Sequence, residues 1–325
     1  MSEYVQLAEF NDRVVDPVEV AVLTAVYNSM LIVYKGMRTI GLVQPEETDE
    51  PASVQKSDGS LFTRWDKDSE EKASEVLAEL APQVLFEGEE GTRSGSGESG
   101  IIVRYDPNDG TRTFVTGGTD ATVIATAYNP DNTIYGAAIG QPSTGRLYSA
   151  FGDRPTEGRL LTLLDKQRAA TELYVPHITT WQGDLSQKGQ VFIDNNRPHP
   201  RNSHVTLTAG QHIQIRARLL DHDLGILERG TNGGQQLAVA SGRDRAAAAL
   251  TTVRGIWVDT SAGVHLVERS GGAVQRYNAV EGVITPVGAE ILDYDMALVA
   301  NNEATLTFLN KLLLGVSIDP AVLKL

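Results

Sequence analysis

The sequence predicts a layered α/β fold, and two observations support this class. Short runs rich in Val and Ile, typical of buried strands, alternate with segments whose apolar residues recur every three or four positions, as in helices. This alternation continues along the 325 residues, and no internal repeat interrupts it. Helices and strands that alternate in this way pack as layers around a sheet. The chain is long enough for one large domain or two packed halves, expected at residues 1–152 and 153–325.

The N-terminal half is expected to begin with two helices. Pro17 favours the first turn of a helix that runs to about Lys35, because a missing N–H costs little at that position. Polar residues interrupt the apolar part between Val18 and Tyr34, so we expect a buried helix rather than a membrane span. A second helix is expected over the sequence DKDSEEKASEVLAELAP, with Asp66 as its N-cap.

Shorter elements follow along the rest of the chain. Short strands are expected at Val84–Phe86 and Ile101–Val103, and three consecutive strands within residues 121–152, with the turn sequence NPDN after the first of the three. In the C-terminal half we expect, in order, a strand at Val191–Asp194, a helix at Ala209–Leu220, a strand at Leu224–Glu228, a helix over RDRAAAALTTV (residues 243–253), a strand at Gly255–Val258, a helix from Asp259 to Gly272, a strand near Ala297–Ala300 and a helix at Glu303–Leu314.

Composition and charge argue against several classes of function. The formal net charge of −14 argues against a nucleic-acid partner or an anionic membrane partner. The chain has no cysteine, which excludes disulfides, thiolate nucleophiles and Cys-ligated metal sites. Its six histidines show no metal-binding spacing. The first residues, MSEYVQLAEFND, lack a signal-peptide pattern, so we expect a cytoplasmic protein.

Acidic residues recur at the ends of expected strands and the starts of expected helices. Asp106 and Asp109 follow a strand and are separated by Pro107 and Asn108, which favour an extended backbone and then a tight turn. The other acidic residues at such positions are Asp66, Glu89, Glu90 and Asp259. Carboxylates gathered at strand ends suit Mg²⁺, which prefers oxygen ligands and keeps positions open for water and phosphate. Each has a plainer alternative, since Asp can cap a helix and DPNDG can form an ordinary hairpin turn.

Four sequence blocks resemble the inositol monophosphatase-like family of metal-dependent phosphatases. They are KSDGSLFTRWDKDSE (56–70), GEE (88–90), DPNDGTRTF (106–114) and DTSAGVHLVERSGG (259–272). The order and rough separation of the blocks agree with the family over about residues 56–272. The resemblance implies an α/β/α/β/α sandwich and a Mg²⁺-dependent, lithium-sensitive phosphatase. Such an enzyme uses metal-activated water and forms no covalent intermediate with the protein.

The resemblance also implies a ligand set for two or three Mg²⁺ ions. Its members would be Asp66, Glu89, Asp106, Asn108 (through its backbone carbonyl), Asp109 and Asp259. Asp66 would hold the third and weakest ion, near the attacking water. Glu90 would lie in solvent.

The catalytic and substrate-binding residues follow from the same resemblance. Glu89, Asp66 and Thr111 would form the catalytic group, with Thr111 helping to orient and deprotonate the water. The substrate would be bound by Gly110, Thr111, Gly233, Gly234, Gln235 and Asp259. The amides of Gly110 and Thr111 would meet the phosphate at a helix N-terminus.

Departures from the family pattern leave the substrate open. Thr252 replaces the acidic residue that contacts the substrate in inositol-hydrolysing members, and no hydroxyl residue stands beside Gly234 in GTNGGQQLA. The first hypothesis is a phosphatase for a small sugar, polyol or cyclitol phosphate. The second is a 3′-phosphonucleotide phosphatase, and the third is a non-catalytic relative that binds a phosphorylated metabolite. A homodimer is possible.

Overall fold

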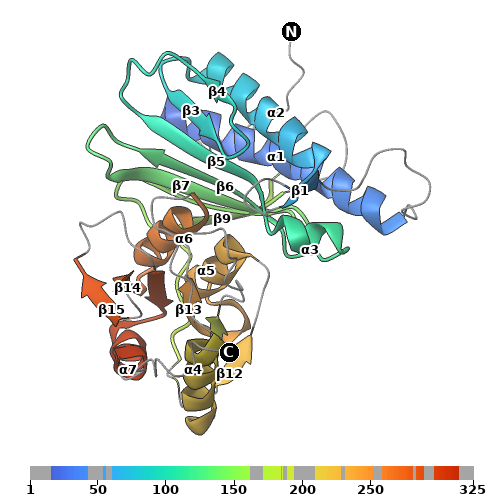
Figure 1. Cartoon of the computed structure of the whole chain (residues 1–325). Helices are drawn as coiled ribbons and strands as arrows, with labels where there is room; N and C mark the ends of the chain where they lie inside the picture. The colour runs from blue at the N-terminus through green and yellow to red at the C-terminus, as the bar shows by residue number, and fades with distance from the viewer. Residues whose placement is uncertain are drawn as a thin grey trace. The chain divides into compact units, whose positions relative to one another are not determined.

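The computed structural model describes residues 16–42, 54–55, 61–161, 171–183, 185, 189–193, 209–227, 231–251, 258–280, 283–288 and 296–314. The chain divides into two compact units, Met1–Ile178 and Thr179–Leu325 (Figure 1). Each unit has its own sheet with helices packed on it, which confirms the α/β class.

The first unit contains an eight-stranded sheet in its described part, in the order β10-β9-β8-β7-β6-β5-β3-β4. Neighbouring strands are antiparallel, except that β3 and β5 are parallel. The strands are β3 (Leu85–Gly88), β4 (Arg93–Ser94), β5 (Ile102–Asp109), β6 (Thr122–Tyr128), β7 (Ile134–Gln141), β8 (Arg146–Phe151), β9 (Glu157–Leu161) and β10 (Thr171–Val175), and β1 (Val54–Gln55) pairs separately with β2 (Leu61–Phe62).

Strands β6, β7 and β8 confirm the three consecutive strands expected from the sequence. The NPDN turn joins β6 to β7: the N–H of Asn132 donates to the carbonyl of Asn129 at 2.9 Å, and Asn132 adopts φ 64°. Asn tolerates this left-handed conformation better than most residues. Strands β9 and β10 lie beyond residue 152 and pair in the same sheet, so the first unit extends past the boundary expected from the sequence.

Helices α1 (Pro17–Leu42) and α2 (Arg64–Leu80) lie side by side on one face of this sheet (Figure 1). Helix α1 runs past Lys35, its expected end. By length and composition the segment Pro17–Ile40 could cross a membrane, but 78% of its apolar window is buried in the structure. Burial against the sheet and α2 supports the expectation of a core helix.

The N-cap of α2 is Thr63 and not Asp66, as had been expected. Asp66 is the third residue of the helix, and its Oδ2 accepts the backbone N–H of Thr63 at 2.9 Å. The Thr63 hydroxyl also bonds to this oxygen. An acidic side chain at this position can reach back to the cap residue, as in a capping box. Asp66 is therefore turned into the protein, where it is 1% exposed.

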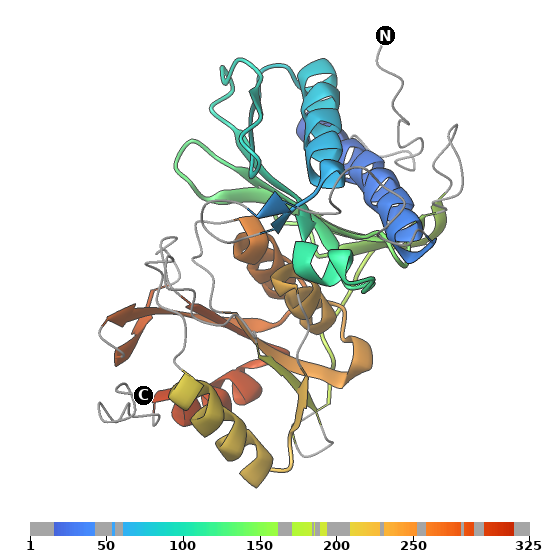
Figure 2. The ribbon, with the colours of Figure 1, turned by 45° about the vertical axis from the view of Figure 1, so that its right-hand side comes forward.

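The second unit contains a six-stranded sheet in its described part, in the order β12-β11-β13-β16-β14-β15. The strands are β11 (Gln190–Ile193), β12 (Gly225–Leu227), β13 (Ala246–Thr251), β14 (Ala273–Val280), β15 (Val283–Val287) and β16 (Met296–Ala300). Helices α5 (Asn232–Ala240) and α6 (Val258–Arg269) cover one face, and α4 (Ala209–Asp221) and α7 (Glu303–Leu314) cover the other (Figure 2).

Most of the elements expected in the C-terminal half are confirmed. Strands β11, β12 and β16 and helices α4, α6 and α7 lie within a few residues of their expected positions. Gly271, with φ 81°, follows the end of α6, in line with the expected glycine termination. The strand expected at Gly255–Val258 falls largely outside the described residues, and Val258 opens α6.

The alanine-rich sequence RDRAAAALTTV was wrongly expected to be a helix. Arg243–Arg245 form a short 3₁₀ turn, and the alanines belong to β13, which lies between β11 and β16. Alanine has the highest helix propensity, but this is a weak preference that tertiary packing overrides. Helices cover both faces of this sheet, and the four alanines of β13, which alternate between the two faces, are completely buried, so their small side chains let helices pack closely on either side.

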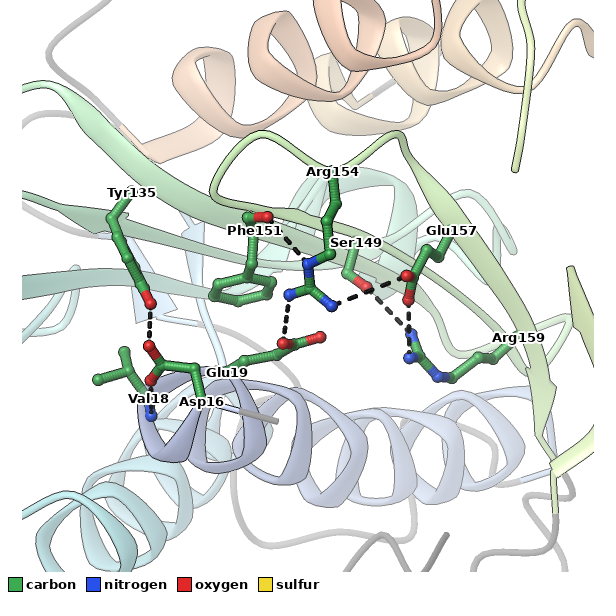
Figure 3. A network of polar contacts seen from close by, with 9 residues as sticks. All are labelled: Asp16, Val18, Glu19, Tyr135, Ser149, Phe151, Arg154, Glu157 and Arg159. Carbon is green, nitrogen blue, oxygen red and sulfur yellow. Dashed lines mark hydrogen bonds and ion pairs between the residues drawn. The ribbon is translucent and has the colours of Figure 1, made fainter. Parts of the chain in front are cut away.

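The start of α1 is tied to the sheet by polar contacts (Figure 3). Asp16 accepts the backbone N–H of Val18 at 2.7 Å and the hydroxyl of Tyr135 on β7. Glu19, in the first turn of α1, pairs with Arg154, which follows β8 and also donates to the carbonyl of Phe151 at 3.1 Å. These contacts fix the N-terminal end of α1 over β7 and β8.

The same network continues to β9. Arg154 lies 3.8 Å from Glu157, and Glu157 pairs with Arg159 at 3.1 Å. Arg159 also donates to the Ser149 hydroxyl at 3.0 Å and lies over the ring of Tyr174. Both Glu157 and Arg159 are buried, so each charge is balanced by a partner in the interior.

Stability should fall as pH rises from about 10 towards 12, and Tyr135→Phe should remove part of that fall. The pKa of Tyr135 is raised to about 12, first by burial and then by its hydrogen bond to Asp16. An unfolded Tyr ionises near pH 10, so between these values the folded state keeps a proton that the unfolded state has lost. The associated stability is present below about pH 10 and is lost as pH rises. Denaturation midpoints of both proteins across this range check it, and an identical pH dependence would contradict it.

Candidate functional site

The end of β5 carries two of the expected carboxylates. The strand does not stop before a tight turn, as had been expected, but runs on to Asp109, and its pairing with β6 shifts register between Asp106 and Asp109. A bulge of this kind inserts an extra residue and changes where side chains point. Gly110 follows with φ 96°, a left-handed conformation that favours glycine, and α3 (Thr111–Val115) begins after it.

Three polar side chains at this bulge are buried: Asp106, Asn108 and Asp109. Asp106 Oδ1 accepts the backbone N–H of Asn108 at 2.8 Å, and Asp109 Oδ2 accepts the Thr122 hydroxyl at 3.1 Å. Asn108 Oδ1 is buried and has no hydrogen-bond partner in the described part of the chain. A buried acceptor without a donor is costly, and a cation is one partner that would satisfy it.

Asp66 on α2 joins this group. Its Oδ1 accepts the Asn108 side-chain amide at 3.2 Å and lies 3.2 Å from the Thr111 hydroxyl. Thr111 Oγ1 is also 3.0 Å from the backbone carbonyl of Asn108. The hydroxyl has one hydrogen and two acceptors within reach, so it can donate to either. The structure thus brings Asp66, from the block at residues 56–70, together with Asn108 and Thr111, from the block at residues 106–114.

The pKa of Asp66 is raised above its usual value, chiefly because the carboxyl is buried. Hydrogen bonds from Thr63, Asn108 and Thr111 act in the opposite direction, because they stabilise the charged form. Burial prevails over these neutral donors. Any further positive partner would stabilise the charged form of this carboxylate.

Glu89 lies in the turn between β3 and β4 and is exposed. Gly88 pairs in register with Tyr105 on the parallel strand β5, and the N–H of Glu89 donates to the carbonyl of Tyr105 at 2.9 Å. Glu89 and Asp106 therefore follow directly from paired residues on neighbouring parallel strands. This register brings the backbone of the GEE block next to that of the DPNDG block.

Glu70 is a residue to which the sequence assigned no role. It is buried on α2, and its two carboxylate oxygens accept the backbone N–H groups of Glu90 and Thr92 at 2.7 and 2.8 Å. The available signal was its spacing: residues four apart on a helix share a face, so Glu70 lies one turn beyond Asp66.

The other expected site residues belong to the second unit. Gly233, Gly234 and Gln235 lie in the first turn of α5 and are buried, and the Thr231 hydroxyl caps this helix by accepting the N–H of Gly234 at 3.1 Å. Asp259 is the second residue of α6, near the helix start as expected, and its side chain is outside the described part of the structure.

The donors gathered in the first unit fit a hard divalent cation. They are carboxylate, amide and carbonyl oxygens, which Mg²⁺ prefers. Among the described residues, no three Asp, Glu, His or Cys side chains are grouped closely enough to hold an ion by themselves. Mg²⁺ commonly keeps several waters and binds through one or two carboxylates together with substrate phosphate, so a partial protein ligand set suits it.

A model of the inositol monophosphatase family matches residues 15–310 of the chain. A comparison with curated proteins gives no match.

Solved structures of similar fold come from several bacteria. The extragenic suppressor protein SuhB from Bartonella henselae is 17% identical with a TM-score of 0.70, over 93% of this chain and 100% of that chain. An inositol monophosphatase from Anabaena is 16% identical with a TM-score of 0.61, over 93% and 98% of the two chains. The IMPase of Thermotoga maritima is 14% identical with a TM-score of 0.61, over 87% and 96%. At these identities the likeness establishes the fold.

Proposed function

We propose that this chain, which belongs to the inositol monophosphatase family, is a Mg²⁺-dependent phosphatase that hydrolyses a small phosphate monoester. The observation that carries the proposal is the group at the end of β5, where the buried Asp66 and Asn108 meet the partly buried Thr111 next to Asp106 and Asp109. A sugar, polyol or cyclitol phosphate is the proposed substrate.

The residues proposed to hold Mg²⁺ are Asp66, Glu89, Asp106, Asn108, Asp109 and Asp259. When bound, Mg²⁺ supplies positive charge for the phosphate dianion and lowers the pKa of coordinated water. Phosphate monoester hydrolysis is among the slowest uncatalysed reactions, so the site must lower the barrier by on the order of 20 kcal/mol. A barrier of this size favours a site that gathers positive charge around the phosphate. The proposed reaction requires no covalent intermediate with the protein.

Thr111 and Asp66 are proposed to orient the attacking water. When the Thr111 hydroxyl donates to Asp66 Oδ1, its oxygen keeps lone pairs that can accept a hydrogen bond from water. Asp66 in turn holds this hydroxyl in one orientation. The pair therefore supplies a hydrogen-bond acceptor for the attacking water and does not itself act as a nucleophile.

We also propose that Li⁺ inhibits the enzyme.

The test is release of inorganic phosphate from a panel of sugar, polyol, cyclitol and nucleotide monophosphates. Each substrate is incubated with Mg²⁺ and with EDTA. We expect Mg²⁺-dependent release from at least one sugar, polyol or cyclitol phosphate. Preference for a 3′-phosphonucleotide would change the substrate class. Absence of release across the panel, in a folded protein with saturating Mg²⁺, would contradict the proposal.

A further inference from the structure

The turn that carries Glu89 uses all of its backbone donors. The N–H of Gly88 donates to the carbonyl of Thr92 at 2.9 Å, the N–H of Glu89 to Tyr105 at 2.9 Å and the N–H of Gly91 to Gly88 at 3.2 Å. The two remaining donors, from Glu90 and Thr92, point at the Glu70 carboxylate. Two of the five hydrogen bonds that define the turn therefore depend on one side chain from another element.

Glu70 is held in place by the same contacts. The side chain is 0% exposed, and in the described part of the chain no Lys or Arg pairs with it. A buried carboxylate requires strong donors, and two backbone N–H groups supply them as charge-assisted hydrogen bonds. Both oxygens are occupied in this way, so the geometry suits support of the turn rather than direct binding of a ligand.

The turn is shaped to fit this carboxylate. A Cβ added at Gly88 would lie 2.0 Å from the Glu70 Cδ, so a larger residue at position 88 would displace the Glu70 carboxylate from this place. One helical turn before Glu70, Asp66 contacts Asn108 and Thr111, and one turn after it the Ser74 hydroxyl bonds to Ser94 on β4 at 2.7 Å. One face of α2 therefore supports both the β3–β4 turn and the end of β5.

We propose that Glu70 is a positioning residue that sets the place of Glu89 relative to Asp106 for metal binding. This inference rests on the proposed function. Glu89 is fixed on one side by its N–H bond to β5, and the next peptide is fixed by Glu70. Without the Glu70 contacts, the turn keeps its attachment to β5 but loses the two hydrogen bonds that tie its amides to α2, so the Glu89 carboxylate samples more positions. Groups that orient metal ligands commonly affect metal affinity by ten- to a hundredfold.

The experiment compares Glu70→Gln with Glu71→Gln. Gln has the shape of Glu but carries only one acceptor oxygen, so its NH₂ group faces one of the two backbone donors. Glu71 is the matched control, because it lies next along α2, is exposed and pairs only loosely with Lys67. Mg²⁺ is titrated against melting temperature, with amide hydrogen exchange of residues 89–92 measured without metal.

We expect Glu70→Gln to raise the half-saturating Mg²⁺ concentration ten- to a hundredfold. The amides of Glu90 and Thr92 should exchange faster, and Glu71→Gln should behave as wild type in both measurements. A merely structural role would lower the metal-free melting temperature and leave the half-saturating Mg²⁺ concentration unchanged. That result would overturn the proposal.

Two further measurements keep the test decisive. If Glu70→Gln does not fold, Glu70→Asp, which keeps the charge but shortens the reach, should show weakened Mg²⁺ binding, and wild-type affinity would overturn the proposal. In the wild-type protein the Glu90 and Thr92 amides should be protected without metal, and rapid exchange would overturn it independently of any variant. A wild-type protein whose melting temperature does not respond to Mg²⁺ would overturn the proposed function as well, which distinguishes the two failures.

Discussion

Asp109→Asn is expected to reduce phosphate release by at least about a thousandfold while the fold remains intact. Asp109 is buried at the end of β5, directly before the left-handed Gly110 and the start of α3. Asn has the same shape and can still accept the Thr122 hydroxyl, but it lacks the negative charge that a divalent cation requires. The measurement is phosphate release on the best substrate of the panel, with melting temperature as the check on folding.

Asp68→Asn is the matched control for this substitution. Asp68 is exposed on α2, two residues from Asp66, and the change of side chain is the same. We expect its activity to remain within about twofold of wild type, since surface substitutions away from special features have small effects. If Asp109→Asn keeps wild-type turnover with a native melting temperature, Asp109 is not a metal ligand in the reaction.

Arg154→Met should destabilise the protein by about 2–3 kcal/mol. The substitution leaves the Glu19 carboxylate, which is 1% exposed, without its cation. Breaking a buried ion pair by removing one partner typically costs 3–5 kcal/mol, and we expect less here because Arg154 is 35% exposed and water reaches the pair. The measurement is chemical denaturation followed by a probe in the first unit.

Two further variants test the cause of this loss. Adding Glu19→Gln to Arg154→Met should recover much of the stability, because no buried charge then remains without its partner. Arg93→Met breaks the exposed pair with Glu87 and should change stability by less than about 0.5 kcal/mol. Equal losses from Arg154→Met and Arg93→Met would show that burial of Glu19 does not matter.

Local sequence signals were enough to predict those helices and strands whose residue pattern agrees with the way the element is buried in the fold. Helix α7 lies at its expected bounds, and the β6–β7 hairpin follows from the two strand-like runs on either side of the NPDN turn. The alanine run was misassigned because its strand state depends on helices from distant parts of the chain. A helix-favouring residue type gives no local sign of such packing.

The sequence likewise predicted some features of the candidate site and missed others. Local signals placed Asp66 in the first turn of a helix but not at its third position, since both assignments satisfy the same helix end. The contact from Asp66 to Thr111 joins residues 45 positions apart, and the contact from Glu70 to Thr92 joins residues 22 apart. Such contacts depend on how α2 lies against the sheet, which short-range patterns do not report.

The network at the start of α1 has a consequence for synthesis of the chain. Glu19 and Arg154 are 135 positions apart, and Asp16 and Tyr135 are 119 apart. At about 5–20 residues per second, roughly 7–27 s separate translation of Glu19 from that of Arg154. During this interval an apolar helix, long enough to span a membrane, is made before all of the strands on which it packs, of which β8 is the last, have been completed. Chaperone binding to the nascent chain is therefore expected at α1, and its release is expected once the strands up to β8 have been made.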